Sequence, residues 1–133
     1  MAITILRDQM ALMRHEVRIG PYSFGADVGA DEGGQGLGAN PHDFYDAALG
    51  ACEALTVLWY ANRKGIPVDN IAVTVERDQS EKRKGVYHLD TKLKLSGNLT
   101  DAQRQELLSV ASKCPVYKLM TSVQTVIETS PVE

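Results

Sequence analysis

The longest apolar pattern in the chain begins after Asn40 and predicts one long helix. Asn40 suits an N-cap, and Pro41 suits the first helical position, where the missing N–H needs no partner. Asp43 is placed to complete a capping box with Asn40. Gly65, followed by Pro67, predicts the end of the helix. About 24 helical residues would extend roughly 36 Å, the width of a small domain.

Polar residues are rare inside this predicted helix. Asp46, Gly50 and Glu53 follow i, i+4, i+7 spacing, so they form one narrow stripe on an otherwise apolar surface. A helix of this kind should be covered by protein on most sides, and we expect the rest of the chain to wrap it. Trp59 and Tyr60 are expected to pack in the core or in a subunit interface.

The chain before the helix predicts strands and a glycine-rich loop. Residues 2–13 and 13–28 have strand character, and Gly20-Pro21 marks a turn or bulge inside the second stretch. Residues 25–39 predict a loop with six glycines and no periodicity. These glycines match neither GxGxxG after a strand nor a P-loop, which argues against a nucleotide site.

Two alternating segments follow the helix. Residues 71–77 and 86–96 alternate apolar and polar positions, and a charged turn at residues 79–85 joins them. This pattern predicts an antiparallel hairpin with one solvated face. The basic run at residues 82–84 could bind phosphate, but it suits a solvated hairpin tip better, given Glu81 beside it and the acidic chain.

The last third of the chain predicts a second helix from Thr100, with Gln103 completing a capping box. Pro115 should end or kink this helix near Cys114. Residues 116–120 predict a short helix, and residues 122–129 predict a final strand. The expected order is β-β-α-β-β-α-β, an α+β fold in a single domain over residues 1–133.

Composition excludes several classes of partner. The chain has 133 residues, a formal net charge of -3 and a pI of about 5.6, which disfavours a nucleic-acid or anionic-membrane partner. Asp46 and Glu53 interrupt the best candidate for a membrane span. The N-terminus lacks the pattern of a signal peptide, so we expect a cytoplasmic location. No metal or cofactor motif is expected.

The candidate chemistry rests on the two cysteines, Cys52 and Cys114. They are too far apart in sequence for a CxxC redox motif or a zinc-binding pair. They could be buried small apolar side chains or a redox pair, and the spacing alone leaves both interpretations open. Cys52 lies about three turns inside the helix, beyond the reach of its dipole, so activation would need a cation or hydrogen-bond donors from elsewhere.

Several motifs resemble the OsmC/Ohr family of osmotically inducible and organic-hydroperoxide-resistance proteins. The resemblance runs from about Glu32 to Thr129, with the motifs in the family's order. Within that family, the chain is most similar to the broad OsmC-like branch. The segments that carry it are Gly38-Ala39-Asn40-Pro41, Ala47-Ala48-Leu49-Gly50-Ala51-Cys52, Tyr60-Ala61-Asn62-Arg63-Lys64-Gly65, Gly97-Asn98-Leu99-Thr100, Gln103-Arg104 and Lys113-Cys114-Pro115-Val116.

The resemblance implies an OsmC-like fold, with antiparallel sheets wrapped around a central cysteine-bearing helix, in an intertwined homodimer. It also implies a peroxidase that reduces organic hydroperoxides, and possibly hydrogen peroxide. Cys52 would be the peroxidatic cysteine, forming a sulfenic acid, and Cys114 the resolving one, forming a disulfide. A dithiol or lipoyl-type reductant would then restore the thiols.

The chain departs from the family pattern at one position. The family places a glutamate directly after Asn-Pro, where this chain has His42. Asp43 is the nearby carboxylate, and it serves equally well as a capping residue. His42 could donate a hydrogen bond to a peroxide oxygen, although histidines at exposed helix starts commonly have no such role.

The family also stabilises the thiolate with an arginine from the N-terminal strands. Arg18 is the first candidate, with Arg7 and Arg14 as alternatives, and each could equally be a surface residue.

Glu53 is expected to be a partly buried acid or a dimer contact. The alternative function is a non-catalytic OsmC-like dimer that binds a small hydrophobic ligand or acts as a stress protein, and the missing glutamate favours it.

Overall fold

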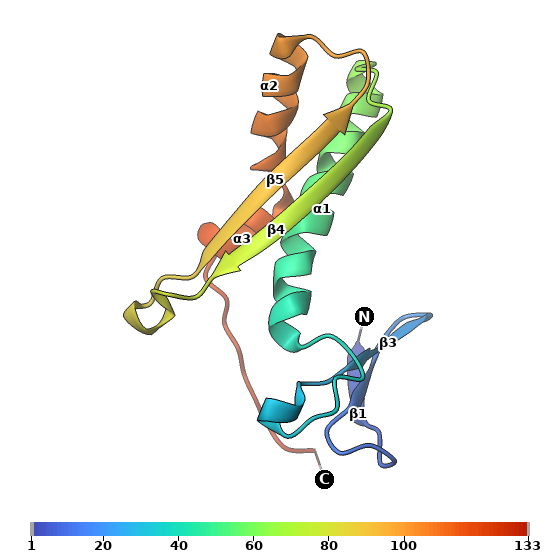
Figure 1. Cartoon of the computed structure of the whole chain (residues 1–133), viewed down its shortest axis with the longest axis vertical. Helices are drawn as coiled ribbons and strands as arrows, with labels where there is room; N and C mark the ends of the chain where they lie inside the picture. Colours follow the sequence, from blue (N-terminus) through green and yellow to red (C-terminus); the bar gives the residue numbers. More distant parts are fainter. Residues whose placement is uncertain (1, 133) are drawn as a thin grey trace. The chain divides into compact units, whose positions relative to one another are not determined.

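The computed structural model describes residues 2–132, which form an α+β fold. The chain divides into two compact units, the first ending at Tyr45 and the second beginning at Asp46. Helix α1 (Pro41–Lys64) begins in the first unit and continues through the second (Figure 1). Among the described residues, no helix combines the length and the apolar content needed to cross a membrane.

The first unit is built on a three-stranded antiparallel sheet in the order β1-β2-β3. The strands are β1 (Ile3–Arg7), β2 (His15–Ile19) and β3 (Tyr22–Ala26). The second stretch predicted from sequence is therefore a hairpin, and its turn contains Gly20, whose φ of 55° favours glycine. The predicted loop follows, with a 3-10 turn, η1 (Ala30–Glu32), inside it.

Helix α1 begins and ends where the sequence predicts. The backbone N–H of Asp43 donates to Asn40 Oδ1, and the N–H of Asn40 donates to Asp43 Oδ2, both over 3.1 Å. This reciprocal pair is a capping box. Gly65 then adopts a φ of 70°, and the N–H of Ile66 donates to the carbonyl of Ala61.

The predicted hairpin is confirmed as β4 (Asn70–Asp78) paired antiparallel with β5 (His88–Ser96). A second 3-10 turn, η2 (Lys82–Lys84), forms its tip. Alternate residues of both strands are exposed and half-buried, as the sequence pattern predicts. The half-buried side includes the cross-strand pair Val73 and Leu93.

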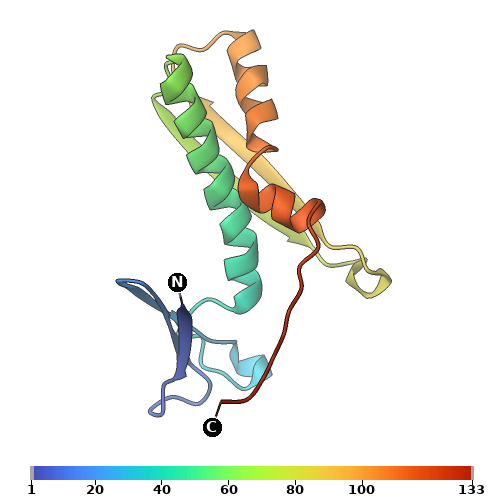
Figure 2. The same cartoon turned by 180° about the vertical axis from the view of Figure 1, so that it is seen from behind.

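Two shorter helices follow the hairpin. Helix α2 (Asp101–Ala111) starts with the predicted capping box between Thr100 and Gln103. Helix α3 (Pro115–Thr121) starts at Pro115 and uses Cys114 as its N-cap. In Figure 1 the hairpin lies in front of α1 and α2, and in Figure 2 the helices lie in front of the hairpin. The core between these elements contains Val57, Ala61, Ile66, Leu107, Val110 and Ala111.

The predicted final strand over residues 122–129 is wrong. After α3 the described chain has neither helix nor strand, and Val126 and Ile127 are 77% and 80% exposed. β-Branched residues favour an extended backbone, but a strand also needs a neighbouring strand for its hydrogen bonds. The residues that the structure describes provide no such neighbour for this segment.

The chain covers α1 on one side, not on most sides as expected. The covered side is the stripe of Asp46, Gly50 and Glu53, which faces the β4–β5 hairpin. The opposite side is apolar and open, with Leu55 69% exposed and Trp59 60% exposed. The polar stripe is buried because the hairpin supplies hydrogen-bond partners for both carboxylates.

Candidate active site

The structure brings Cys52 and Cys114 together within the second unit. Cys52 lies in the middle of α1 and is partly exposed, whereas Cys114 is fully buried at the start of α3. Both sulfurs lie against the first turn of α3, and interaction with Cys52 is one cause of the raised pKa of the Cys114 thiol. Both are free thiols in this structure. Pro115 produces this arrangement, because it separates α2 from α3 and leaves Cys114 extended at the junction.

Each sulfur accepts a backbone N–H from the first turn of α3. Val116 donates to Cys52 Sγ over 3.5 Å, and Tyr117 donates to Cys114 Sγ over 3.3 Å. The hydroxyl of Thr56, one turn along α1, lies 4.0 Å from Cys52 Sγ. Donors aimed at sulfur stabilise a thiolate more than a thiol. Cys52 thus receives one hydrogen-bond donor, the Val116 N–H, from elsewhere in the fold, and the sequence analysis expected its activation to depend on such a group or on a cation.

Burial raises the pKa of the Cys114 thiol. The Tyr117 N–H opposes this effect, while the nearby Cys52 and the charge of Glu53 raise the pKa further. Cys114 is therefore held as a protonated thiol behind the partly exposed Cys52. The two sulfurs differ in access to solvent, as a sulfur that meets a substrate and a second, resolving sulfur would.

Glu53 is a buried acid beside this pair. Its side chain is almost inaccessible, and the Thr91 hydroxyl of β5 donates to Oε2 over 3.1 Å. Oε1 has no hydrogen-bond partner among the residues that the structure describes. Burial raises the pKa of Glu53, and the Thr91 hydrogen bond partly offsets the rise. Glu53 is therefore buried more completely than the partly buried acid expected from sequence.

Asp46, the other acid of the stripe, is fully engaged by the hairpin. Arg77 forms an ion pair with its carboxylate, and the Tyr87 hydroxyl donates to both carboxylate oxygens over 2.8 and 2.9 Å. A buried carboxylate needs this degree of pairing. Asp46 therefore joins α1 to the hairpin, and Glu53 differs from it in having an unsatisfied oxygen.

The remaining candidate residues lie in the first unit. Arg18 is on the exposed surface of β2, where its guanidinium forms a paired hydrogen bond with Glu16. Arg14 is half-buried and pairs with Asp8 over 3.3 Å. Asp43 caps α1, as described above. His42 is exposed on the first turn of α1, and Arg7 is exposed at the end of β1.

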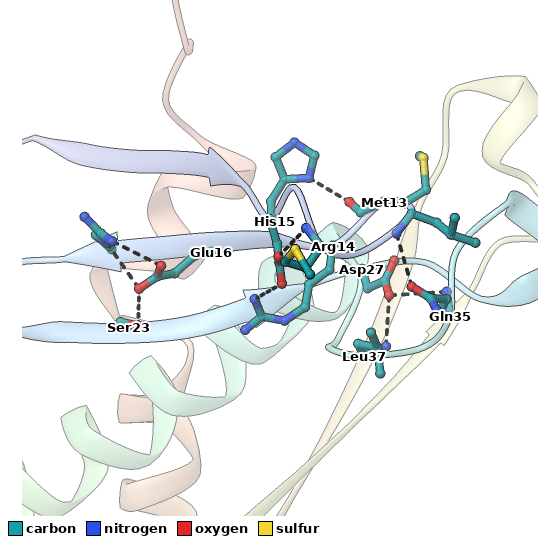
Figure 3. A network of polar contacts seen from close by, with 12 residues as sticks. Met13, Arg14, His15, Glu16, Ser23, Asp27, Gln35 and Leu37 are labelled. Atoms are coloured by element: carbon teal, nitrogen blue, oxygen red, sulfur yellow. Dashed lines mark hydrogen bonds and ion pairs between the residues drawn. The ribbon is translucent and has the colours of Figure 1, made fainter.

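A second polar network organises the glycine-rich loop of the first unit. Asp27 is buried and accepts backbone N–H groups from Leu37, Val28 and Gln35 (Figure 3). The Leu37 hydrogen bond is the main cause of the lowered pKa of Asp27, and Arg14 contributes through its charge. This network is structural: it holds the loop that leads to the start of α1.

The sequence analysis missed two features of the site. Val116 contributes its backbone N–H, and the residue type gives no indication that this group reaches Cys52. The Glu53–Thr91 hydrogen bond joins a helix to a distant strand, and only the alternation that placed Thr91 on the apolar side of β5 gave any indication. Within residues 2–132, the His, Cys, Asp and Glu side chains form no cluster suited to a metal ion.

Comparison with known proteins agrees with this architecture. The OsmC structure from Legionella pneumophila, named an organic hydroperoxide resistance protein, is 18% identical, with a TM-score of 0.67 over 92% of this chain and 90% of that one. OhrB of Bacillus subtilis is 21% identical, with a TM-score of 0.58 over 92% of each chain. An OsmC-like protein from Mycoplasma pneumoniae is 18% identical, with a TM-score of 0.74 over 92% and 87%.

No protein with a curated description matches the chain in sequence. At these identities the solved structures establish the fold, which is that of the OsmC and Ohr proteins. The model of the family described as OsmC-like protein matches residues 33–130, about three quarters of the chain. The chain therefore belongs to the OsmC-like protein family.

Proposed function

We propose that this protein is a thiol-dependent peroxidase that reduces organic hydroperoxides through Cys52 and Cys114. The main observation behind the proposal concerns the two cysteines. The partly exposed Cys52 sulfur, which accepts a backbone N–H, lies beside the same turn of α3 as the buried Cys114 thiol, which comes from a distant part of the chain. The similar structures named organic hydroperoxide resistance proteins support the same reaction class.

The first step is attack of the Cys52 thiolate on the distal oxygen of the hydroperoxide. The O–O bond breaks, Cys52 becomes a sulfenic acid, and the alkoxide leaves as an alcohol after taking up a proton. The Val116 N–H stabilises the attacking thiolate. An arginine of the N-terminal strands would assist, and Arg18 remains our first candidate because it lies in the extended segment just before the glycine-rich loop, with Arg7 and Arg14 as alternatives. We assign Asp43 to this step as the nearest counterpart of the family's glutamate.

In the second step the Cys114 sulfur attacks the sulfenic acid, forming a Cys52–Cys114 disulfide and releasing water. A dithiol or lipoyl-type reductant then returns both thiols by exchange. The cycle suits a reducing compartment such as the cytoplasm, where a disulfide of this kind is transient.

We further propose that the protein is a homodimer of single OsmC-like domains. The support is the open apolar side of α1, where Leu55 and Trp59 are mostly exposed. An apolar helix face of this kind is typical of a subunit interface. A second copy of the chain is the occupant that the family resemblance implies.

The test is stoichiometric treatment of the reduced protein with tert-butyl hydroperoxide, followed by non-reducing mass spectrometry. We expect loss of both thiols and an intrachain Cys52–Cys114 disulfide. Cys114→Ser should stop at a sulfenic acid that dimedone traps, and the matched variant Cys52→Ser should not react. If Cys52→Ser consumes peroxide as fast as the unmodified protein, the proposal is wrong.

The alternative function is binding of a small hydrophobic ligand, and one cavity favours it. A cavity of about 310 Å³ in the first unit is lined mainly by apolar groups of Ile5, Met13, His15, Ala26, Val28 and Pro41. An environment-sensitive apolar dye should bind there if this function holds. Under this alternative, Met13→Lys should abolish the dye signal. The unmodified protein should also fail to consume peroxide.

A further inference from the structure

Thr56 is an unusual residue for the middle of α1. Between Ala47 and Trp59, the polar side chains of this helix other than cysteine are Glu53 and Thr56. Glu53 faces the hairpin, where the Thr91 hydroxyl donates to it. Threonine is less favourable than alanine inside a helix, because its branched side chain loses rotamer freedom there. Helix propensity therefore does not favour a threonine at position 56.

The Thr56 side chain lies over the turn of α1 that contains Cys52. Side chains of a helix lean toward its N-terminus, so each residue covers the one four positions earlier. The Thr56 hydroxyl oxygen lies 4.0 Å from Cys52 Sγ, and both side chains are half-buried. A threonine inside a helix commonly bonds to the carbonyl four residues before it. The hydroxyl of Thr56 instead contacts the sulfur of that residue.

The ionisation of Cys52 fixes the direction of this hydrogen bond. In the thiol form either atom could be the donor, but a thiolate has no proton, so the hydroxyl must donate. The Val116 N–H, 3.5 Å from the same sulfur, is a second donor. Hydrogen bonds to an ionised acceptor are shorter and stronger than neutral ones, so the Thr56 contact should contract when the thiolate forms.

The charged groups of the second unit are engaged or exposed elsewhere. On the hairpin, Arg77 pairs with Asp46, and the Glu53 carboxyl group of α1 is held by Thr91 of β5. On the helices, charged side chains lie over aromatic rings, bond to other groups or are exposed: Arg63, Lys64, Arg104, Glu106, Lys113 and Lys118. The donors that the structure places on the Cys52 sulfur are therefore neutral: one backbone N–H and one hydroxyl.

We propose that the Thr56 hydroxyl donates a hydrogen bond to the Cys52 thiolate and is a catalytic residue in its attack on the hydroperoxide. This inference rests on the function proposed above. In that attack the sulfur–oxygen bond forms, the oxygen–oxygen bond breaks, and two electrons pass from sulfur to the peroxide. Thr56 keeps its proton throughout, so the balance of the step is unchanged. Its contribution is to increase the fraction of Cys52 that is ionised and to hold the sulfur in one orientation.

The hydrogen bond can be tested without peroxide. Cys114→Ser leaves Cys52 as the single thiol, and serine is itself a preferred N-cap, so α3 should keep its start. In this background the ultraviolet absorbance of the thiolate gives the ionised fraction of Cys52. Release of thiopyridone from dithiodipyridine gives the rate of attack by the sulfur. Both are measured over a range of pH.

Thr56→Val removes the hydroxyl at nearly constant shape. At acid pH, where the thiol form predominates, the thiolate fraction should fall about tenfold, the lower end of the usual effect of a hydrogen bond to a charged group. A thiolate that has lost a donor is more nucleophilic, so the rate there should fall only about fourfold. At alkaline pH, where Cys52 is ionised in both proteins, Thr56→Val should react about threefold faster.

Three further variants complete the test. Thr56→Ser keeps the hydroxyl and should restore both the acid and the alkaline rates. Thr56→Ala lacks the hydroxyl but favours the helix, so it should give the same crossover as Thr56→Val even if valine disturbs α1. Thr74→Val, on the exposed side of β4, is the matched control and should change neither rate. Circular dichroism checks that each variant is folded.

A rate that changes by the same factor at every pH would overturn the inference, because Thr56 would then act through its shape. A Thr56→Ser variant that behaves like Thr56→Val would overturn it equally. Failure of the proposed function gives a different pattern: Cys52 resists tert-butyl hydroperoxide in every variant, while the crossover with pH remains. That pattern would support Thr56 as the hydrogen-bond donor of Cys52 and reject the peroxidase.

Discussion

Gly50 of α1 and Val75 of β4 lie so close that a Cβ atom at position 50 would be 2.7 Å from Cγ2 of Val75. This close approach brings the helix onto the hairpin two residues before Cys52 and three before Glu53. It also explains the glycine, which is otherwise unfavourable inside a helix by about 1 kcal/mol relative to alanine. The packing of α1 on the hairpin is therefore a condition for the Glu53–Thr91 contact.

The first prediction concerns this packing. Gly50→Ala should destabilise the protein by about 1 kcal/mol, because overpacking against a stiff β-branched side chain costs about 2 kcal/mol and helix propensity returns about 1 kcal/mol. Urea unfolding measures the change. In a Val75→Ala background, the same Gly50→Ala change should be stabilising, since the clash is absent. Equal effects in both backgrounds would contradict the packing explanation.

The local parts of this fold could be predicted from sequence because their signals are local. The cap formed by Asn40 and Asp43, the box at Thr100 and the alternation of the hairpin all depend on neighbouring residues. The strand predicted over residues 122–129 failed because strand propensity does not provide a pairing partner. The side of α1 that is buried could not be predicted either, because the hydrogen-bond partners of its carboxylates lie in a hairpin distant in sequence.

The candidate active site could also be predicted only in part. The two cysteines could be selected from sequence through their family motifs, but the Val116 N–H that reaches Cys52 is a backbone group. The role of Glu53 was left open between a buried acid and a dimer contact. Its environment is set by a tertiary contact with Thr91, which no sequence period specifies.

The second prediction concerns Asp27 in the first unit. Its pKa is lowered, chiefly by the Leu37 N–H, so the folded state binds its proton less tightly than the unfolded state. Its stabilising effect is fully present above its ordinary value of 3.8 and is lost as the pH falls through the lower folded value. Asp27→Asn should reduce the melting temperature at neutral pH and flatten its decline in acid.

Thermal unfolding of both proteins across the acid range measures this effect. Asp31→Asn is the matched control, because Asp31 is an exposed carboxylate of the same loop. An acid decline that is equally steep in Asp27→Asn and in the control would rule out Asp27 as its source.

The third prediction concerns the open side of α1. Leu55→Lys places a charge on the apolar face and should weaken dimerisation by about 2 kcal/mol or more, roughly thirtyfold in Kd. Sedimentation equilibrium over a concentration series measures it. Leu108→Lys on α2 is the control, because Leu108 is also partly exposed but lies on a different helix. If Leu55→Lys leaves the dissociation constant of the dimer unchanged, the interface lies elsewhere on the protein.

The last prediction concerns the burial of Glu53. Burial raises its folded pKa above the ordinary value of 4.5, so the folded state binds the proton more tightly than the unfolded state. The contribution of Glu53 to stability should therefore be most favourable in acid and fall as the pH rises through the interval between these two values. Glu53→Gln lacks the ionisation and should not show this decline, so its stability advantage over the unmodified protein should grow toward neutral pH.

Denaturant midpoints at a series of pH values test this directly, with Glu76→Gln as the control at an exposed glutamate. If Glu53→Gln instead loses stability at every pH, the carboxyl group is a structural acid that the fold requires in its ionised form.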